Sequence, residues 1–132
     1  MIAETIVRKS APTDRTEHQE QAALMGWVKK NEHKWGGALR VLYAIPNQGA
    51  RNPNGDGQRK RREGMRAGVP DVCLPVARKG FHALYIEMKR TQKGRVERHQ
   101  SEWLLWLSEE DNLTAVCYGA DAAKQVIEEY LT

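Results

Sequence analysis

The apolar and polar positions of this chain follow helical spacing in some segments and strand-like runs in others. Thr16, followed three positions later by Gln19, forms a capping-box pattern that opens a helix reaching about His33. The strands are expected at 39–45, within 72–84 as two arms of a hairpin, and at 113–118. Further helices are expected at 96–110 and 122–131, and the basic segment 58–66 also suits a helix.

The order of these segments bounds the fold. Residues 1–14 are expected to form a flexible N-terminal arm before a single domain at 15–132. Segment 46–57 is rich in proline, asparagine and glycine, which is typical of a loop. Because strands and helices are mixed, helices must cover a central sheet. The pattern therefore predicts an α/β domain with a mixed four-stranded sheet flanked by helices.

Length and composition suit an ordinary globular domain. The chain has 132 residues, of which 40% are hydrophobic and 29% charged. It lacks both the run of roughly 20 apolar residues that a spanning helix needs and the apolar core of a signal peptide. We therefore expect a cytoplasmic protein without a membrane partner. Cys73 and Cys117 lie in apolar stretches and are expected to be reduced core residues.

Positive charge is concentrated in the middle of the chain. The net charge is +4, whereas the last third carries acidic groups at 109–111 and 128–129. Such asymmetry favours one face that meets a polyanion, most often nucleic acid. The alternative is a solvated charged surface. The basic positions are Arg59, Lys60, Arg61, Arg62, Arg66, Arg78, Lys79, Lys89, Arg90, Lys93, Arg95 and Arg98.

A pair of carboxylates is the sharpest feature. A hairpin turn centred at Lys79 sets Asp71 opposite Glu87, eight residues away on either side. Directly opposed residues have Cβ atoms roughly 4.5–5.5 Å apart, so two carboxylates there repel unless a cation or a proton joins them. Strand alternation places Lys89 on the same face as Glu87, with Ile86 and Met88 on the other.

Two interpretations of this pair remain open. Carboxylate oxygens are the ligands of hard divalent cations such as Mg²⁺, which indicates a metal site. The alternative is a cross-strand ion pair between one of the acids and Lys89. The four histidines have no zinc-type spacing, so a structural zinc is not expected.

Pro70-Asp71 followed by Glu87-Met88-Lys89 resembles the PD-(D/E)XK nuclease motif, and the αβββαβ order resembles that superfamily's core. The chain resembles the VRR-NUC domain more closely, a small nuclease module of phage and bacterial proteins. Five segments carry the resemblance in family order across nearly the whole chain. They are 17–21, Ile45 to Gly49, Gly64 to Asp71, Ile86 to Lys89, and Gln100.

The resemblance implies roles for single residues. Asp71, Glu87 and the Met88 carbonyl would bind Mg²⁺ or Mn²⁺, and an acid of the first helix would assist directly or through water. Glu17 is expected in that place because the family's Glu-x-x-x-Gln pattern matches Glu17 and Gln21, with Glu20 as the alternative. Lys89 would orient or deprotonate the attacking water, and orientation is the safer role beside carboxylates.

Other positions have both a functional and a structural interpretation. Gln100 lies on the apolar face of its helix and would sit beside Lys89, or would bond the backbone of a sheet edge. Trp103 and Trp106 are expected in the core or an interface rather than stacked on bases. The residues expected to contact DNA are Asn47, Arg51, Arg59, Lys60, Arg61, Arg62, Arg66, Lys93 and Arg95.

The expected function is that of a metal-dependent DNA endonuclease using one or two Mg²⁺ or Mn²⁺ ions. For stand-alone members the resemblance points to branched DNA such as a four-way (Holliday) junction, to a homodimer, and to a bacterial or phage-infected cytoplasm. The alternative is a non-catalytic basic protein that binds DNA. A restriction endonuclease ranks below both, because no base-reading helix is evident.

Overall fold

A computed structural model describes residues 4–46 and 55–132. The elements follow in the order β1 (Ile6–Lys9), α1 (Glu17–Lys30), the 3₁₀ helix η1 (Trp35–Val41), β2 (Tyr43–Ala44), α2 (Gly55–Arg62), β3 (Val72–Leu74), β4 (Leu84–Lys89), α3 (Arg98–Glu109), β5 (Leu113–Tyr118) and α4 (Ala120–Leu131). No helix in these two ranges is long and apolar enough to cross a bilayer.

The central sheet is mixed, as predicted, but has five strands instead of four. Their order is β1-β5-β4-β3-β2; β1 and β4 run parallel to β5, and the pairs β4–β3 and β3–β2 are antiparallel. The additional strand, β1, lies inside the expected N-terminal arm. Its four residues alternate between half-buried and exposed at the sheet edge, so the sequence pattern of this short segment predicts a strand only weakly. Pairing with β5 makes it a strand.

The segment expected to be a buried strand at 39–45 is a strand only at its end, and that strand is exposed. A 3₁₀ helix occupies Trp35–Val41, and only Tyr43–Ala44 pair with β3. Gly36 and Gly37 have φ angles of 65° and 84° and turn the chain before Leu39, which is buried. A short apolar run does not by itself distinguish a strand from a buried helical turn, which is why the prediction was wrong.

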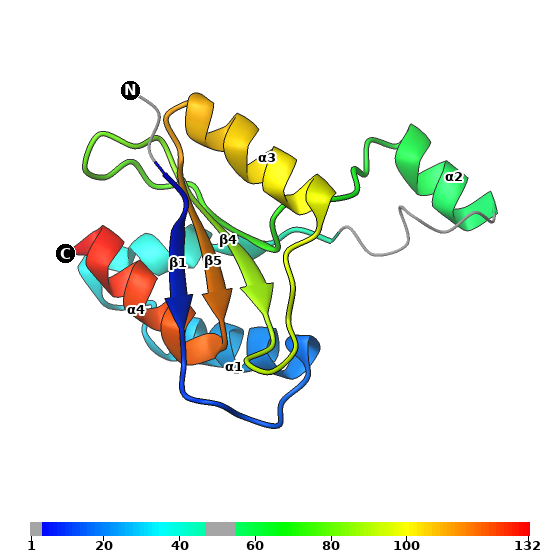
Figure 1. Cartoon of the computed structure of the whole chain (residues 1–132). Coiled ribbons are helices and arrows are strands. Elements are labelled where there is room, and N and C mark those ends of the chain that lie inside the picture. The colour runs from blue at the N-terminus through cyan, green and yellow to red at the C-terminus, as the bar shows by residue number, and fades with distance from the viewer. Residues whose placement is uncertain (1–3, 47–54) are drawn as a thin grey trace.

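The second helix, α2, begins inside the expected loop, at Gly55, and ends at Arg62 rather than Arg66. Seen in Figure 1, α2 projects away from the sheet. Its last turn is entirely basic, from Arg59 to Arg62. Gly57 is buried, whereas the arginines of this turn are exposed.

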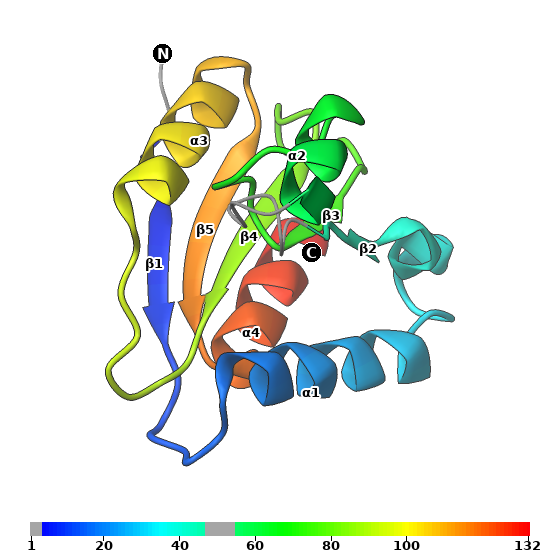
Figure 2. The same ribbon diagram turned by 90° about the vertical axis from the view of Figure 1, so that its right-hand side faces the viewer.

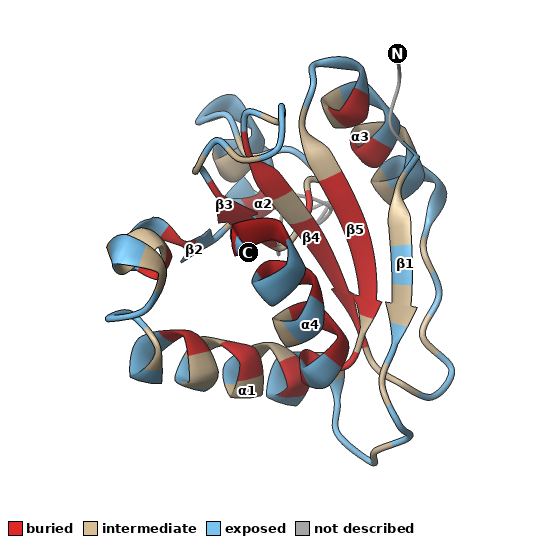
Figure 3. Cartoon of the chain, turned by 90° about the vertical axis from the view of Figure 1, so that its left-hand side faces the viewer, coloured by how far each residue is buried: buried red, intermediate tan, exposed pale blue. Residues whose placement is uncertain are grey.

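Helices cover both faces of the sheet. Figure 2 shows α3 on one side of the sheet and α4 and α1 on the other, with α1 running below the ends of β4 and β5. Figure 3 shows buried positions concentrated on β4, β5 and the inner sides of α1 and α4. Leu24 and Val28 of α1 join Ile86 and Met88 of β4 and Ile127 of α4 in one buried cluster. Cys73 and Cys117 are buried and unbridged, as expected.

The predicted hairpin register is confirmed. Val72 pairs with Ile86, and Leu74 pairs with Leu84, which is the register of a turn centred at position 79. At that turn, Lys79 and Gly80 both have positive φ angles, of 55° and 86°. One step outward from Val72 and Ile86, the same register brings Asp71 opposite Glu87.

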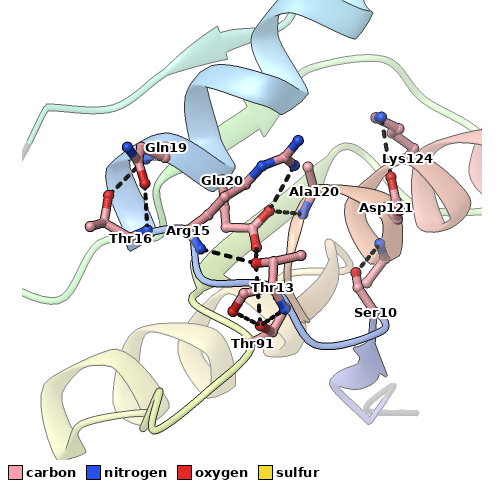
Figure 4. Close-up of polar contacts among 11 residues, drawn as sticks. Ser10, Thr13, Arg15, Thr16, Gln19, Glu20, Thr91, Ala120, Asp121 and Lys124 are labelled. Carbon is pink, nitrogen blue, oxygen red and sulfur yellow. Dashed lines mark hydrogen bonds and ion pairs between the residues drawn. The ribbon is translucent and has the colours of Figure 1, made fainter.

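A buried carboxylate connects α1 to the rest of the domain. The side chain of Glu20 accepts hydrogen bonds from Thr13 Oγ1 at 2.6 Å and from the Ala120 amide at 3.0 Å, and it pairs with Arg15 at 3.4 Å (Figure 4). It thereby ties the segment before α1 to the N-terminus of α4. The capping box of Thr16 and Gln19 is also formed.

These contacts determine how Glu20 titrates. Burial raises its pKa, but the hydrogen bonds from Thr13, Ala120 and Arg15 outweigh burial, so the pKa lies below its ordinary value of 4.5. A carboxyl whose folded pKa is depressed stabilises the fold above its unfolded pKa. That contribution is lost as the pH falls through the lower folded value.

Glu20→Ala is expected to lower the free energy of unfolding at pH 7 by about 2–4 kcal/mol, because a buried amide and hydroxyl lose their acceptor. The corresponding drop in Tm is on the order of 10 °C, measurable by circular dichroism. Glu128→Ala, an exposed change on α4, serves as the control. Equal melting of the two variants would contradict the role assigned to Glu20.

Candidate active site

Three acidic side chains from three separate elements converge at one point. Glu17 is the first residue of α1, Asp71 directly precedes β3, and Glu87 belongs to β4. One carboxylate oxygen from each lies within 4.8 Å of the others. We call these three residues, together with Lys89, the acidic site.

Asp71 is held in place by the neighbouring strand. Its Oδ2 accepts a hydrogen bond from the Met88 amide at 2.7 Å, and its carbonyl accepts one from the Ile45 amide at 2.7 Å. The register continued by two positions sets Pro70, which has no amide hydrogen, opposite Met88. The Met88 amide donates to the Asp71 carboxylate, so this side chain takes the place of a backbone acceptor in the ladder.

The same geometry directs the Met88 carbonyl. In a strand, the N–H and C=O of one residue point to the same side. Because the Met88 amide points at Asp71, its carbonyl points toward the same side, where Pro70 offers no donor. This orientation is compatible with the predicted role of the Met88 carbonyl as a ligand.

Lys89 shares its face of β4 with Glu87, as strand alternation predicted. Its side chain is almost completely buried, and Nζ lies 3.6 Å from Glu87 Oε2 and 4.0 Å from Glu17 Oε2. The predicted alternative, an ion pair between Glu87 and Lys89, is therefore present. It does not balance the site, because one ammonium faces three carboxylates.

The electrostatics show the remaining imbalance. Burial and the neighbouring charge of Asp71 raise the pKa of Glu87 to about 10. Burial also raises the pKa of Asp71 and of Glu17, although Lys89 opposes both shifts. Neither oxygen of Glu87 has a hydrogen-bond partner among the described residues. Without a further cation, the site holds its carboxylates together only by taking up protons.

A divalent cation suits this set of donors. The cluster offers only carboxylate oxygens, and hard cations such as Mg²⁺ and Mn²⁺ prefer such ligands. The two buried oxygens of Glu87 that lack partners are unfavourable in a metal-free site and are suitable ligands in an occupied one. Glu17, Asp71 and Glu87 would hold the ion.

A hollow of about 600 Å³ opens beside these carboxylates. Its polar lining includes Glu17, Asp71 and Gln100, and its apolar lining includes Ala22 and Met25 of α1 and the chain at 44–46. His18, Ala22, Met25 and Ala44 were not identified from the sequence. In the sequence these residues show only their spacing along α1 or their position in β2. Neither property reveals that α1 and β2 border the same hollow.

Gln100 lines this hollow, and its side chain forms a hydrogen bond within the start of its own helix. Its Oε1 accepts from the Glu97 amide at 2.8 Å, as part of a capping box at the start of α3. The amide thus bonds a helix terminus rather than the sheet-edge backbone of the structural alternative. Its predicted action beside Lys89 stays a prediction.

The structure distinguishes the two acids of the first helix by their surroundings. Glu17 faces Asp71 and Glu87 across the site, whereas Glu20 lies in the buried network with Thr13 and Ala120. The two positions are three residues apart, so they project from the same side of α1. Only the position of the β4 end relative to α1 separates them. The role of Glu17 as a ligand stays a prediction.

The predicted DNA-contacting residues occupy several surfaces. Arg59, Arg61 and Arg62 are exposed on α2, where Arg59 and Lys60 also pair with Asp56 at 3.1 and 3.0 Å. Arg66 is exposed in the segment between α2 and β3, and Lys93 and Arg95 are exposed between β4 and α3. Asn47 and Arg51 lie outside the described residues.

Comparisons with known proteins agree with the resemblance found in the sequence. A family model described as the VRR-NUC domain matches residues 14–121, a range that contains the whole acidic site. The chain is also similar to a solved structure described as a VRR_NUC domain protein. The TM-score is 0.76 at 26% sequence identity, with 89% of each chain covered. No curated protein matches the chain.

Glu87→Gln is expected to stabilise the metal-free protein. An acid whose folded pKa is raised costs nothing below its unfolded pKa of 4.5, and the cost grows until the pH reaches about 10. The uncharged amide removes this cost, so Tm at pH 8 should rise by on the order of 5 °C. Its pH dependence between these values should flatten.

The measurement is thermal unfolding in EDTA, repeated with Mn²⁺, which should raise the Tm of the unmodified protein but not that of Glu87→Gln. Glu128→Gln on α4 is the matched control and should behave as the unmodified protein. If Glu87→Gln melts at a lower temperature than the unmodified protein in EDTA, the buried carboxyl of Glu87 does not destabilise the metal-free fold.

Proposed function

Because the chain belongs to the VRR-NUC domain family, whose members are nuclease-type proteins, we propose that it hydrolyses DNA phosphodiester bonds with a divalent cation. The observation that carries this proposal is the acidic site. Three carboxylates converge there, the two oxygens of Glu87 lack hydrogen-bond partners among the described residues, and an ammonium group is fixed beside them. Such an arrangement suits metal-assisted phosphodiester hydrolysis, since charge develops on the phosphoryl oxygens.

In the proposed reaction Glu17, Asp71, Glu87 and the Met88 carbonyl hold Mg²⁺ or Mn²⁺. When bound, the cation supplies positive charge that polarises the scissile phosphate and lowers the pKa of water. The hydrogen bond from the Met88 amide orients the Asp71 carboxylate before the cation binds. Pre-orientation of this kind reduces the reorganisation that the reaction would otherwise require.

Lys89 acts on the attacking water and on the phosphate. Its Nζ is held between Glu87 and Glu17 at 3.6 and 4.0 Å. An ammonium held by two carboxylates orients a water by hydrogen bonding and stabilises charge on the phosphoryl oxygens. Gln100, at the wall of the adjoining hollow, positions the water or Lys89.

The basic residues around the site bind the DNA backbone. Phosphate contacts position a nucleic acid without reading its sequence, and arginine and lysine supply most of them. The projecting α2 presents Arg59, Lys60, Arg61 and Arg62. Arg66, Lys93 and Arg95 lie on the two segments that lead to β3 and α3, and Asn47 and Arg51 complete the proposed set.

The proposed substrate is branched DNA, with the four-way junction as first choice, and the proposed active form is a homodimer. A two-fold dimer presents two identical sites to a substrate with two-fold symmetry. The exposed basic helix supports contact with more than one duplex arm. The competing function is a metal-independent protein that binds DNA through the same basic surfaces without cutting it.

Asp71→Asn and Lys89→Ala are each expected to lower the rate at which a plasmid or junction substrate is nicked in Mg²⁺ by roughly 100- to 1000-fold. Loss of a group that stabilises the transition state has an effect of this size. EDTA should abolish cleavage, and Glu128→Gln should cut normally. If the unmodified protein and both variants bind DNA equally, and the unmodified protein cuts none in Mg²⁺ or Mn²⁺, the metal-independent alternative is favoured.

The substrate proposal is tested with a panel of single-stranded, duplex, flap and four-way junction DNA of equal length. We expect the junction to be cut at least about tenfold faster than the duplex, a difference of roughly 1.4 kcal/mol in barrier, by a species that sediments as a dimer. A monomer that cuts flaps as fast as junctions would refute both the junction preference and the dimer.

A further inference from the structure

A pair of tryptophans on α3, expected in the core or an interface, lies at the surface of the described chain. Trp106 is 49% exposed and Trp103 is half-buried. Their rings are 5.7 Å apart at 66°, an edge-to-face arrangement. Neither belongs to the buried core cluster among the described residues. A large aromatic surface turned toward solvent indicates recognition rather than packing.

The two rings line a hollow separate from the one at the acidic site. Its volume is about 190 Å³, and it is lined by Arg66, Ala67, His99, Glu102, Trp103 and Trp106. We call it the tryptophan hollow. At roughly 30 Å³ per water molecule, this space exceeds what a single water occupies. Aromatic, cationic and polar groups thus surround one small space.

The tryptophan hollow adjoins the acidic site through two connections. His99 lines the tryptophan hollow and the next residue, Gln100, lines the hollow beside the carboxylates. Arg66 and Asp71 are five residues apart on one segment, so their Cα atoms are separated by at most roughly 18 Å. That distance corresponds to a few nucleotides of one strand.

The segment that joins the two hollows is tightly seated against α3. A Cβ atom at Gly68 would lie 2.8 Å from the backbone and Cβ of His99, and the φ angle of Gly68 is 94°. Only glycine suits both conditions. The placement of Arg66 relative to Asp71 is therefore constrained by the packing of this segment on the first turn of α3.

Positive charge near the tryptophan hollow comes from residues outside α3. Glu97 caps the start of this helix, and Arg98 forms an ion pair at 3.3 Å with Glu102, the one acid of the tryptophan hollow. Arg66, which lines the hollow, and Lys93, which is exposed before α3, supply the positive charge that a polyanion reaching the acidic site would meet.

We propose that the tryptophan hollow binds an unpaired base of the strand whose phosphate lies at the acidic site. Aromatic side chains stack on bases of any sequence, but only on bases released from the duplex stack. Arg66 would hold the neighbouring phosphate. The inference rests on the proposed function and narrows its substrate to DNA with an unpaired segment a few nucleotides from the scissile bond.

The test measures DNA binding in EDTA, where no cleavage occurs. Fluorescence anisotropy of the full chain compares a labelled oligo-dT strand with a blunt duplex of equal length at one fixed salt concentration, because both affinities depend on salt. Trp106→Ala is expected to weaken binding of the single strand roughly tenfold, as loss of one stacked base does. Duplex binding should stay unchanged.

Two matched variants accompany this change. Leu105→Ala, at the adjacent position that is also 49% exposed, should bind both DNAs normally. Trp106→Phe keeps a ring and should retain most of the single-strand affinity. It should also lose part of the quenching of tryptophan fluorescence that oligo-dT causes in the unmodified protein, a readout that does not depend on the folding of the alanine variant.

The inference is overturned if Trp106→Ala weakens both DNAs equally or neither, or if oligo-dT quenches Trp106→Phe as much as the unmodified protein. It is also overturned if Trp106→Ala mainly dissociates a dimer in sedimentation, which would assign this face to a second copy. Selective binding of the single strand without any cleavage in Mg²⁺ would instead remove the proposed function and leave the tryptophan hollow as a binding site.

Discussion

The antiparallel pairing of β3 with β4 is the constraint on which the site depends. It brings Asp71 opposite Glu87, and it places the Asp71 carboxylate where it accepts a hydrogen bond from the Met88 amide at 2.7 Å. A slip of one residue would turn Glu87 and Lys89 into the apolar cluster that now holds Ile86 and Met88. The burial of this cluster therefore enforces the register that assembles the charged groups.

Two glutamates of α1 illustrate how similar side chains acquire opposite roles. Glu20 receives hydrogen bonds from Thr13 and Ala120, and its pKa is lowered. Glu17 lies near Asp71, its burial is not offset by such donors, and its pKa is raised. Glu20 thus stabilises the domain, while Glu17 joins a cluster that is unfavourable without a cation. A site of this kind sacrifices stability for function.

Helix α3 separates two surfaces of different chemistry. Gln100 lines the hollow beside the acidic site, and the preceding residue, His99, lines the tryptophan hollow. Residues from both the first and the last turn of α3 line the tryptophan hollow. In the proposed complex, one strand of nucleic acid would contact both surfaces across this helix.

The sequence by itself determined the local features: the capping box at Thr16, the hairpin centred at Lys79, the shared face of Glu87 and Lys89, and the α/β class, since each depends on neighbouring residues and periodicity. Tertiary structure decided the rest. β1 became a strand only through β5, and the 35–41 segment became a 3₁₀ helix around buried Leu39. The family pattern favoured Glu17 over Glu20, but only the packing of α1 against the end of β4 brings Glu17 to the other carboxylates. The exposure of Trp106 likewise depends on how distant elements pack.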